Sequence, residues 1–128
     1  MTKHNNFAAL LGSAHAAGMA AGNAAKPHAM IVGEPTTLLG NQIDHSKPTY
    51  YVPDGVCGFA WITVRPGTSS FARWLVKNGH ARKAYRGGVD IWVHQFGQSM
   101  ERKQAYAYAY AKVLNEAGIT AYSESRMD

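Results

Sequence analysis

The sequence predicts an α+β fold in which two helices pack on an antiparallel sheet, with an additional helix at the N-terminus. From Cys57 onward, strand-like and helix-like segments follow in the order strand, helix, strand, strand, helix, strand, which is the split βαβ order of ferredoxin-like folds. The predicted helix-capping residues agree with this order. One predicted helix follows the hydroxyl residues of "RPGTSS" and ends at Gly79, and the other follows Ser99 and ends at Gly118.

The N-terminal segment 5–25 predicts an alanine-rich helix that Asn5 or the next asparagine can cap. Gly12, Gly18 and Gly22 each weaken an exposed helix by about 1 kcal/mol relative to alanine. We therefore expect the helix to gain support by close packing on a neighbour, either within the chain or on another subunit of a homo-oligomer. A partly frayed arm is the alternative.

The remaining elements follow from alternation, helical spacing and turn residues. "HAMIV" and "TYYV" predict short strands on either side of a long loop, residues 33–48, and long loops in compact domains are often functional or mobile. The predicted core strands are 57–64, 81–85, 89–96 and 119–125, and the core helices are 71–78 and 100–117. Because 128 residues suit one domain, we expect a single domain over 1–128 with its α+β core at 49–128.

The amino-acid composition of the chain restricts its expected partners, redox chemistry and location. The formal net charge of +5 favours anionic partners such as nucleotides, nucleic acids or acidic surfaces. The single cysteine, Cys57, excludes an internal disulfide, and its place in an apolar strand predicts a buried thiol. We read the N-terminal segment as a helix, because His15, Asn23 and the glycines dilute the apolar core that a signal peptide needs. We expect a cytoplasmic protein with no membrane partner.

Two strand-to-helix junctions are candidate anion sites, because a helix N-terminus presents free backbone N–H groups. In "RPGTSS", Arg65 and Thr68 could contact phosphate oxygens, and Arg73 lies in the following helix. The loop lacks the lysine and the spacing of a P-loop. A capped turn without a ligand is the alternative.

The second junction, "HQFGQS", repeats this pattern with Phe96, Gln98 and Ser99. Arg102 lies in the first turn of the next helix, where a cation opposes the helix dipole. Because a cation is unfavourable at this position, its presence favours a role for Arg102 in ligand binding. The alternative is that Arg102 belongs to a solvated surface without a ligand. After the last strand comes Arg126, which could clamp a phosphate or form a surface pair with an acidic group.

Between the two junctions every ionic residue up to Val89 is basic, which predicts a positive surface. In the ferredoxin-like order, Trp61 and Trp92 fall on the first and third strands, where RNA-recognition domains place the aromatic residues that stack on bases. Against this, "RGGVDIWV" lacks most of the aromatic motif of those domains. A buried Trp92 beneath the N-terminal helix is the alternative.

No catalytic constellation is evident. Cys57, His94 and Asp90 could form a thiol-based site only if the thiol were accessible. The histidines show no metal-ligand spacing. We therefore predict a binding protein without catalytic residues, metal or cofactor.

Three segments carry a resemblance: "YVPDGVCGFAWITV", "GGVDIWV" and "GQSMERKQAYAYAYAKVLNEAGITAYSESRMD". They resemble a family of small bacteriophage proteins that end in S-R-M-D, and the chain is similar to the Thoeris anti-defence sponge proteins. That resemblance implies a non-enzymatic oligomer in the host cytoplasm that sequesters cyclic ADP-ribose isomers or cyclic oligonucleotides. It assigns no binding residue of this chain.

The first functional prediction is therefore sequestration of a small anionic nucleotide signal without turnover. Its predicted ligand-binding residues are Arg65, Thr68, Arg73, Phe96, Gln98, Ser99, Arg102 and Arg126. The alternatives are a basic nucleic-acid-binding module and a protein inhibitor of a host defence enzyme.

Overall fold

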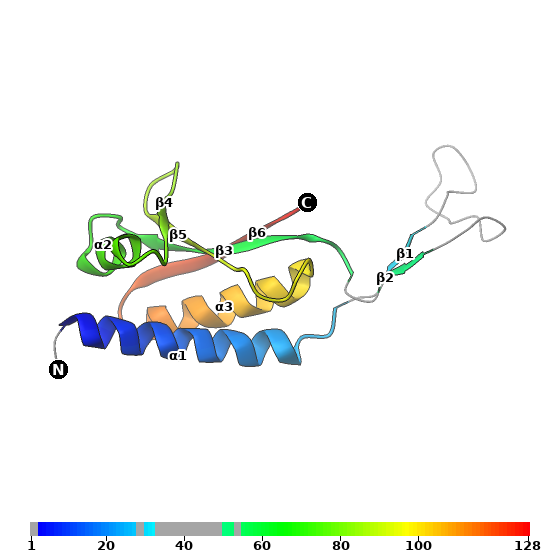
Figure 1. Cartoon of the computed structure of the whole chain (residues 1–128), viewed down its shortest axis with the longest axis horizontal. Helices are drawn as coiled ribbons and strands as arrows, with labels where there is room; N and C mark the ends of the chain where they lie inside the picture. The colour runs from blue at the N-terminus through cyan, green and yellow to red at the C-terminus, as the bar shows by residue number, and fades with distance from the viewer. Residues whose placement is uncertain (1–2, 28–29, 33–49, 53–54) are drawn as a thin grey trace.

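The computed structural model describes residues 3–27, 30–32, 50–52 and 55–128 (Figure 1). The predicted loop 33–48 lies outside the described residues. The elements are, in chain order, α1 (Lys3–Ala24), β1 (Met30–Val32), β2 (Tyr50–Val52), β3 (Gly58–Arg65), α2 (Ser70–Lys77), β4 (Arg82–Lys83), β5 (Val89–Trp92), α3 (Met100–Glu116) and β6 (Thr120–Met127).

The main sheet has four antiparallel strands in the order β4-β5-β3-β6, so the predicted α+β fold with ferredoxin-like strand order is confirmed. The last strand is held along its whole length: Gly58 of β3 lies opposite Met127, and Arg65 lies opposite Thr120. β1 and β2 form a separate antiparallel pair, which lies beyond one end of the layered core (Figure 1).

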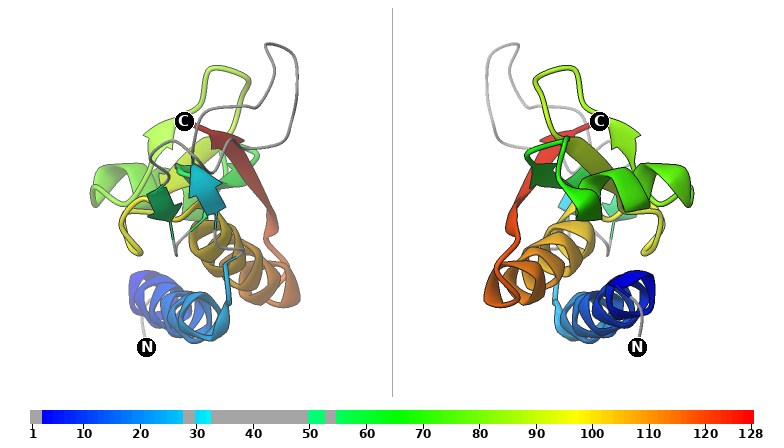
Figure 2. Two further views of the ribbon diagram at one scale, coloured as in Figure 1. Left: turned by 90° about the vertical axis from the view of Figure 1, so that its right-hand side faces the viewer. Right: turned by 90° about the vertical axis from the view of Figure 1, so that its left-hand side faces the viewer.

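Alternation along β3 gives the sheet two different faces. Ala60, Ile62 and Val64 have no exposed surface and pack in the core with buried residues of α2 and α3, such as Leu75 and Leu114. Figures 1 and 2 show α3 against this face and α1 beneath α3. No helix among the described residues covers the opposite face, so the side chains that alternate with the core residues face outward.

The expected support for α1 comes from within the chain. α1 packs along α3 through a face of small residues that includes Ala14, which is fully buried. A Cβ atom at Gly18 would lie 2.7 Å from the Tyr106 ring, and one at Gly22 would collide with Phe96. The glycines that weaken the isolated helix therefore allow this contact. The predicted homo-oligomer stays a prediction.

The helix ends match the sequence predictions. Ser69 Oγ accepts a hydrogen bond from the Ala72 amide at 3.1 Å, and Ser99 Oγ accepts one from Arg102 at 3.3 Å. Gly118 follows α3 with φ 86°, and the Ile119 amide donates to the Leu114 carbonyl at 3.0 Å. This is the predicted Schellman ending.

Three predictions are wrong in detail. β6 extends to Met127, so Arg126 lies within the last strand, opposite Phe59, instead of after it. The strand predicted to reach Phe96 ends at Trp92, because the chain turns away toward the start of α3: Phe96 adopts φ 69°, and the Gln95 side chain accepts from the His94 amide at 3.1 Å. Cys57 is exposed instead of buried. It precedes β3, where its backbone bridges Ser99 at the rim of the sheet.

Within the described ranges, no helix is both long enough and apolar enough to cross a membrane.

Candidate functional site

The face of the sheet opposite α3, which we call the open face, carries aromatic, basic and acidic side chains from three strands. Its residues are Phe59, Trp61, Thr63 and Arg65 of β3, Asp90 and Trp92 of β5, and Tyr122, Glu124 and Arg126 of β6.

An aromatic platform lies at the centre of this face. Trp61 and Trp92 are directly opposite each other on β3 and β5, and their ring centroids are 4.7 Å apart at an interplanar angle of 32°. Phe59 meets the Trp92 ring edge to face at 6.3 Å. Both tryptophans are only half-buried. Exposed ring faces of this kind can stack on nucleobases of any sequence.

An arginine stands at each end of the platform. The Arg126 guanidinium lies 5.5 Å above the Phe59 ring, and the Arg65 guanidinium lies 5.4 Å above the Tyr122 ring. Tyr122 lies opposite Thr63, which is four residues from Phe59 on β3, a separation of roughly 13 Å in an extended strand. Two cations at this spacing suit phosphates along an extended strand of nucleic acid.

Two carboxylates lie beside the platform, joined by Thr63, which is 2 % exposed. Glu124 Oε2 accepts from the Trp61 indole N–H at 2.8 Å, and the Thr63 hydroxyl lies 3.2 Å from the same oxygen and 2.8 Å from Asp90 Oδ1. These bonds fix the Trp61 ring. The remaining carboxylate lone pairs can accept hydrogen bonds from the amino groups of bases.

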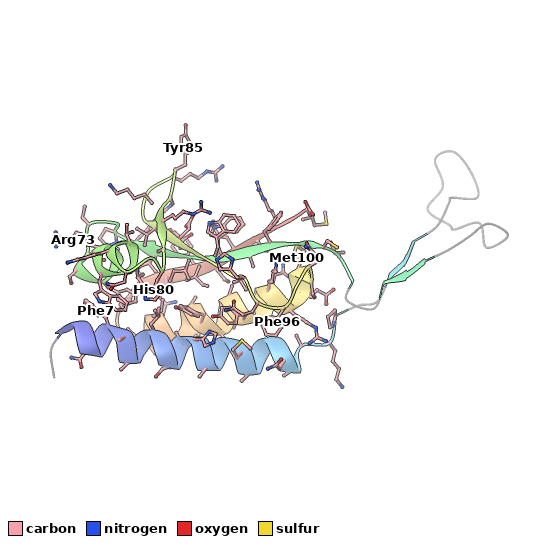
Figure 3. All side chains as sticks on the ribbon, in the orientation of Figure 1. Phe7, Arg73, His80, Tyr85, Phe96 and Met100 are labelled. Atoms are coloured by element: carbon pink, nitrogen blue, oxygen red, sulfur yellow. The ribbon has the colours of Figure 1, made fainter. Side chains whose placement is uncertain are left out.

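The turn between β4 and β5 forms a wall at one end of the open face. Tyr85 at its tip is fully exposed and projects from the body of the molecule (Figure 3). The turn is anchored because Arg65 donates to the Arg86 carbonyl at 3.3 Å, and because Gly88 lies so close to β3 that a Cβ would be 2.6 Å from the Val64 oxygen. Turn and sheet together enclose a recess of about 460 Å³ that contains Arg65, Arg86 and Arg126.

The predicted site residues fall into three groups. Arg65 and Arg126 lie on the open face. Thr68 and Arg73 line a different recess of about 530 Å³, between α2 and the β4–β5 turn, together with Lys77. The six cations of the basic stretch are all exposed, which agrees with the predicted positive surface; they are Arg65, Arg73, Lys77, Arg82, Lys83 and Arg86.

The third group, Phe96, Gln98, Ser99 and Arg102, holds the start of α3 in place. Phe96 packs on Tyr106 and against α1, the Gln98 carbonyl accepts from Gly58, and buried Ser99 is the N-cap. The Arg102 guanidinium reaches the carbonyl of Gly22 in α1 at 3.5 Å. Figure 3 places Phe96, near the start of α3, well apart from Arg73 on α2, so the structure does not bring the two predicted junctions together.

Sequence reasoning identified the two tryptophans and two arginines but missed the other partners on the open face. Phe59, Tyr122 and Glu124 were not singled out, although "GFAWITVR" alternates small or aliphatic residues with aromatic or polar ones. That period of two marks one strand face as different from the other. It does not show which face the helices cover.

The described part of the chain contains no group of three histidine, cysteine, aspartate or glutamate side chains placed to hold a metal ion. Comparisons with known proteins found no matching family model, curated protein or solved structure. The functional argument therefore rests on the geometry of the open face.

Proposed function

We propose that the open face binds a short single-stranded segment of nucleic acid. The observation that supports this most directly is the Trp61–Trp92 pair, half-buried at the centre of a sheet face with an arginine at each end. Bases stack on the platform while the arginines neutralise phosphates. The rings beneath the two guanidinium groups, Phe59 and Tyr122, are roughly 13 Å apart along the sheet, so this surface accommodates a short segment of a few nucleotides.

The β4–β5 turn extends this surface. Tyr85 and Arg86 stand beside Arg65, so a base and its phosphate that pass the end of β3 meet a further ring and a further cation. The carboxylates of Asp90 and Glu124 lie between the cations, where they oppose a purely electrostatic mode of binding. The surface is therefore suited to stacking and to contacts with base edges, with few phosphate contacts.

A second candidate is capture of a small anionic nucleotide, as the resemblance to sponge proteins implies. The enclosed recess of about 460 Å³ favours it, because aromatic and arginine side chains converge there within the size range of small-ligand sites, about 300–1,000 Å³. In this case the protein releases the ligand unchanged after denaturation.

The test is fluorescence anisotropy with a labelled single-stranded oligonucleotide. Trp92→Ala removes one stacking ring and is expected to weaken binding about 5- to 150-fold, which corresponds to about 1–3 kcal/mol per stacked base. The matched control is Tyr108→Ala, which removes an aromatic side chain that is 68 % exposed on α3, away from the open face. It is expected to leave affinity unchanged.

Salt dependence and competition separate the two candidates. Two or three phosphate contacts predict a slope of log K against log salt of about −1.4 to −2.1 for a single strand. A mononucleotide or cyclic dinucleotide that displaces the oligonucleotide at much lower concentration favours the second candidate. Equal affinity of Trp92→Ala and the unmodified protein for both ligand types would overturn both.

A further inference from the structure

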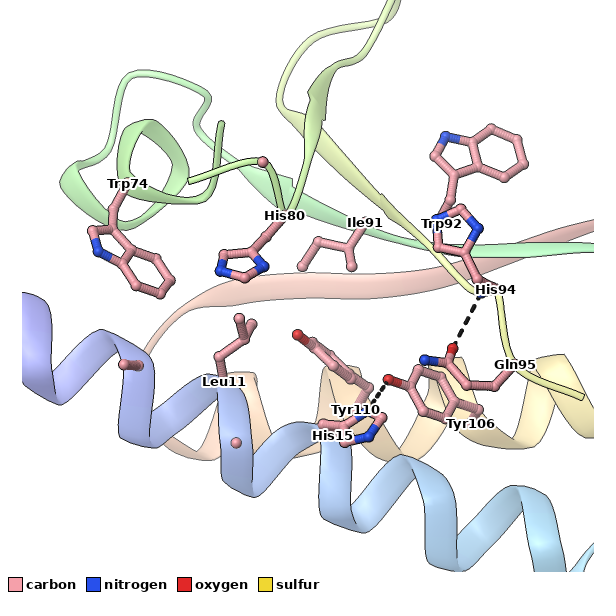
Figure 4. A pocket seen from close by; sticks show the side chains of 13 residues that line it. Leu11, His15, Trp74, His80, Ile91, Trp92, His94, Gln95, Tyr106 and Tyr110 are labelled. Carbon is pink, nitrogen blue, oxygen red and sulfur yellow. Dashed lines mark hydrogen bonds between the residues drawn. The ribbon is translucent and has the colours of Figure 1, made fainter. Parts of the chain in front are cut away.

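A further recess lies between α1, the end of α2, β5 and α3 (Figure 4). Its volume is about 530 Å³, which is within the usual range for small-ligand sites. We call it the α1 recess. Its walls come from four segments far apart in the sequence, represented by Leu11, His80, Ile91 and Tyr110.

Aromatic rings dominate the lining. The rings of Trp74 and His80 face each other obliquely at 5.3 Å, on the side formed by α2. Tyr106 and Tyr110 of α3 form the opposite side, with their centroids 5.6 Å apart. No lysine, arginine, aspartate or glutamate is among the lining residues. A planar and uncharged molecule matches this lining better than a phosphate does.

Tyr110 supplies the polar group of the recess. The residue is only 3 % exposed, and its hydroxyl end is directed into the space beneath His80 and Ile91 (Figure 4). Among the described residues no side chain or carbonyl forms a hydrogen bond with this hydroxyl, whereas the neighbouring Tyr106 hydroxyl bonds to His15 Nδ1 at 2.6 Å. The Tyr110 hydroxyl is therefore available to a molecule in the recess, to which it can donate one hydrogen bond and from which it can accept another.

We propose that the α1 recess binds a neutral, planar heteroaromatic compound whose ring stacks among these side chains and whose edge hydrogen-bonds to the Tyr110 hydroxyl. The inference does not rest on the proposed function, because among the described residues Trp92 is the one that borders both the α1 recess and the recess of the open face, and the other lining residues differ. The side chains of Gln95 and His94 at the rim provide further polar contacts for such a ring.

NMR of the tryptophan indole N–H signals tests the proposal, since Trp74 lines the α1 recess and Trp61 lies on the open face. Adenosine and benzimidazole are the probes, and cyclohexanol is the non-planar control. Both probes are expected to shift the Trp74 signal, and cyclohexanol is not. Shifts of Trp61 alone, or no shift of Trp74 at millimolar probe concentrations, would overturn the proposal.

Two variants sharpen the test. Gly12 lines the α1 recess, and a Cβ there meets no atom within 4 Å, so Gly12→Leu adds an apolar side chain at the wall of the recess. It is expected to abolish the Trp74 shifts without lowering the melting temperature, while Ala16→Leu on the exposed side of α1 leaves them intact. Tyr110→Phe is expected to weaken probe binding about 2- to 12-fold, the value of one neutral hydrogen bond. Unchanged affinity in both Gly12→Leu and Tyr110→Phe would refute the site.

Discussion

Alanine substitutions at two glycines of α1 provide a direct test of how this helix packs on the core. In a solvated helix, glycine to alanine stabilises by about 1 kcal/mol. At Gly12 the new methyl group would meet no atom within 4 Å, so Gly12→Ala is expected to raise the free energy of unfolding by about that amount. At Gly18 the methyl group would lie 2.7 Å from the Tyr106 ring.

The Tyr106 ring cannot easily yield, because it is 4 % exposed and its hydroxyl bonds to His15. Overpacking of this kind costs about 1–3 kcal/mol. Because the gain in helix propensity is common to both variants, it cancels in the comparison. Gly18→Ala is therefore expected to be less stable than Gly12→Ala by about 1–3 kcal/mol.

Urea unfolding followed by circular dichroism measures both free energies under one set of conditions. The comparison requires equal m-values, so that the difference reports on the native contact and not on the unfolded state. If the two variants are equally stable, α1 does not press its glycine face onto α3. Both the packing described above and the α1 recess would then lose their basis.

Three further outcomes follow from individual contacts. Tyr106→Phe removes the hydrogen bond to His15 and is expected to cost about 1 kcal/mol in urea unfolding, whereas Tyr110→Phe costs no stability. Burial raises the pKa of Tyr106 to about 12, above its value of 10.0 in an unfolded chain. The stability that this tyrosine contributes is therefore complete below pH 10 and is lost as the pH rises to about 12. The loss of stability over this pH range is expected to be smaller in Tyr106→Phe. Arg126→Ala is expected to weaken oligonucleotide binding and to leave the melting temperature nearly unchanged, because the side chain is exposed above Phe59. A lower melting temperature with normal binding would instead show that Arg126 has a structural role.

Local signals in the sequence were sufficient to predict most elements and their order. Ser99 before α3 and Gly118 after it are short-range features whose physics acts within a single turn of helix, so they can be recognised without tertiary information. The end of β5 was not predictable in this way. "VHQF" has strand propensity, but the tertiary requirement to reach the N-cap of α3 sets Phe96 at φ 69° and ends the strand early.

The sites depend on longer-range information. Arg65 and Arg126 could be nominated as cations, yet their arrangement at opposite ends of one aromatic platform follows from the antiparallel register of β3 and β6. Likewise, His15 and Tyr106 are 91 residues apart and come together only because α1 packs on α3. Ser99 has a hydroxyl group that could contact a ligand, but in the structure this hydroxyl caps α3 and the residue is buried.

The composition of the open face is itself evidence for a binding role. A sheet face that meets only water is normally polar, because accessible aromatic rings create a surface to which other molecules adhere. Here Trp61 and Trp92 occupy adjacent central strands, and a hydrogen bond from the Trp61 indole to Glu124 holds one of the rings in position. On the covered face, the same strand carries only Ala60 and residues such as Ile62 that the core requires. Core packing therefore accounts for one face of β3, whereas the proposed ligand would account for the other.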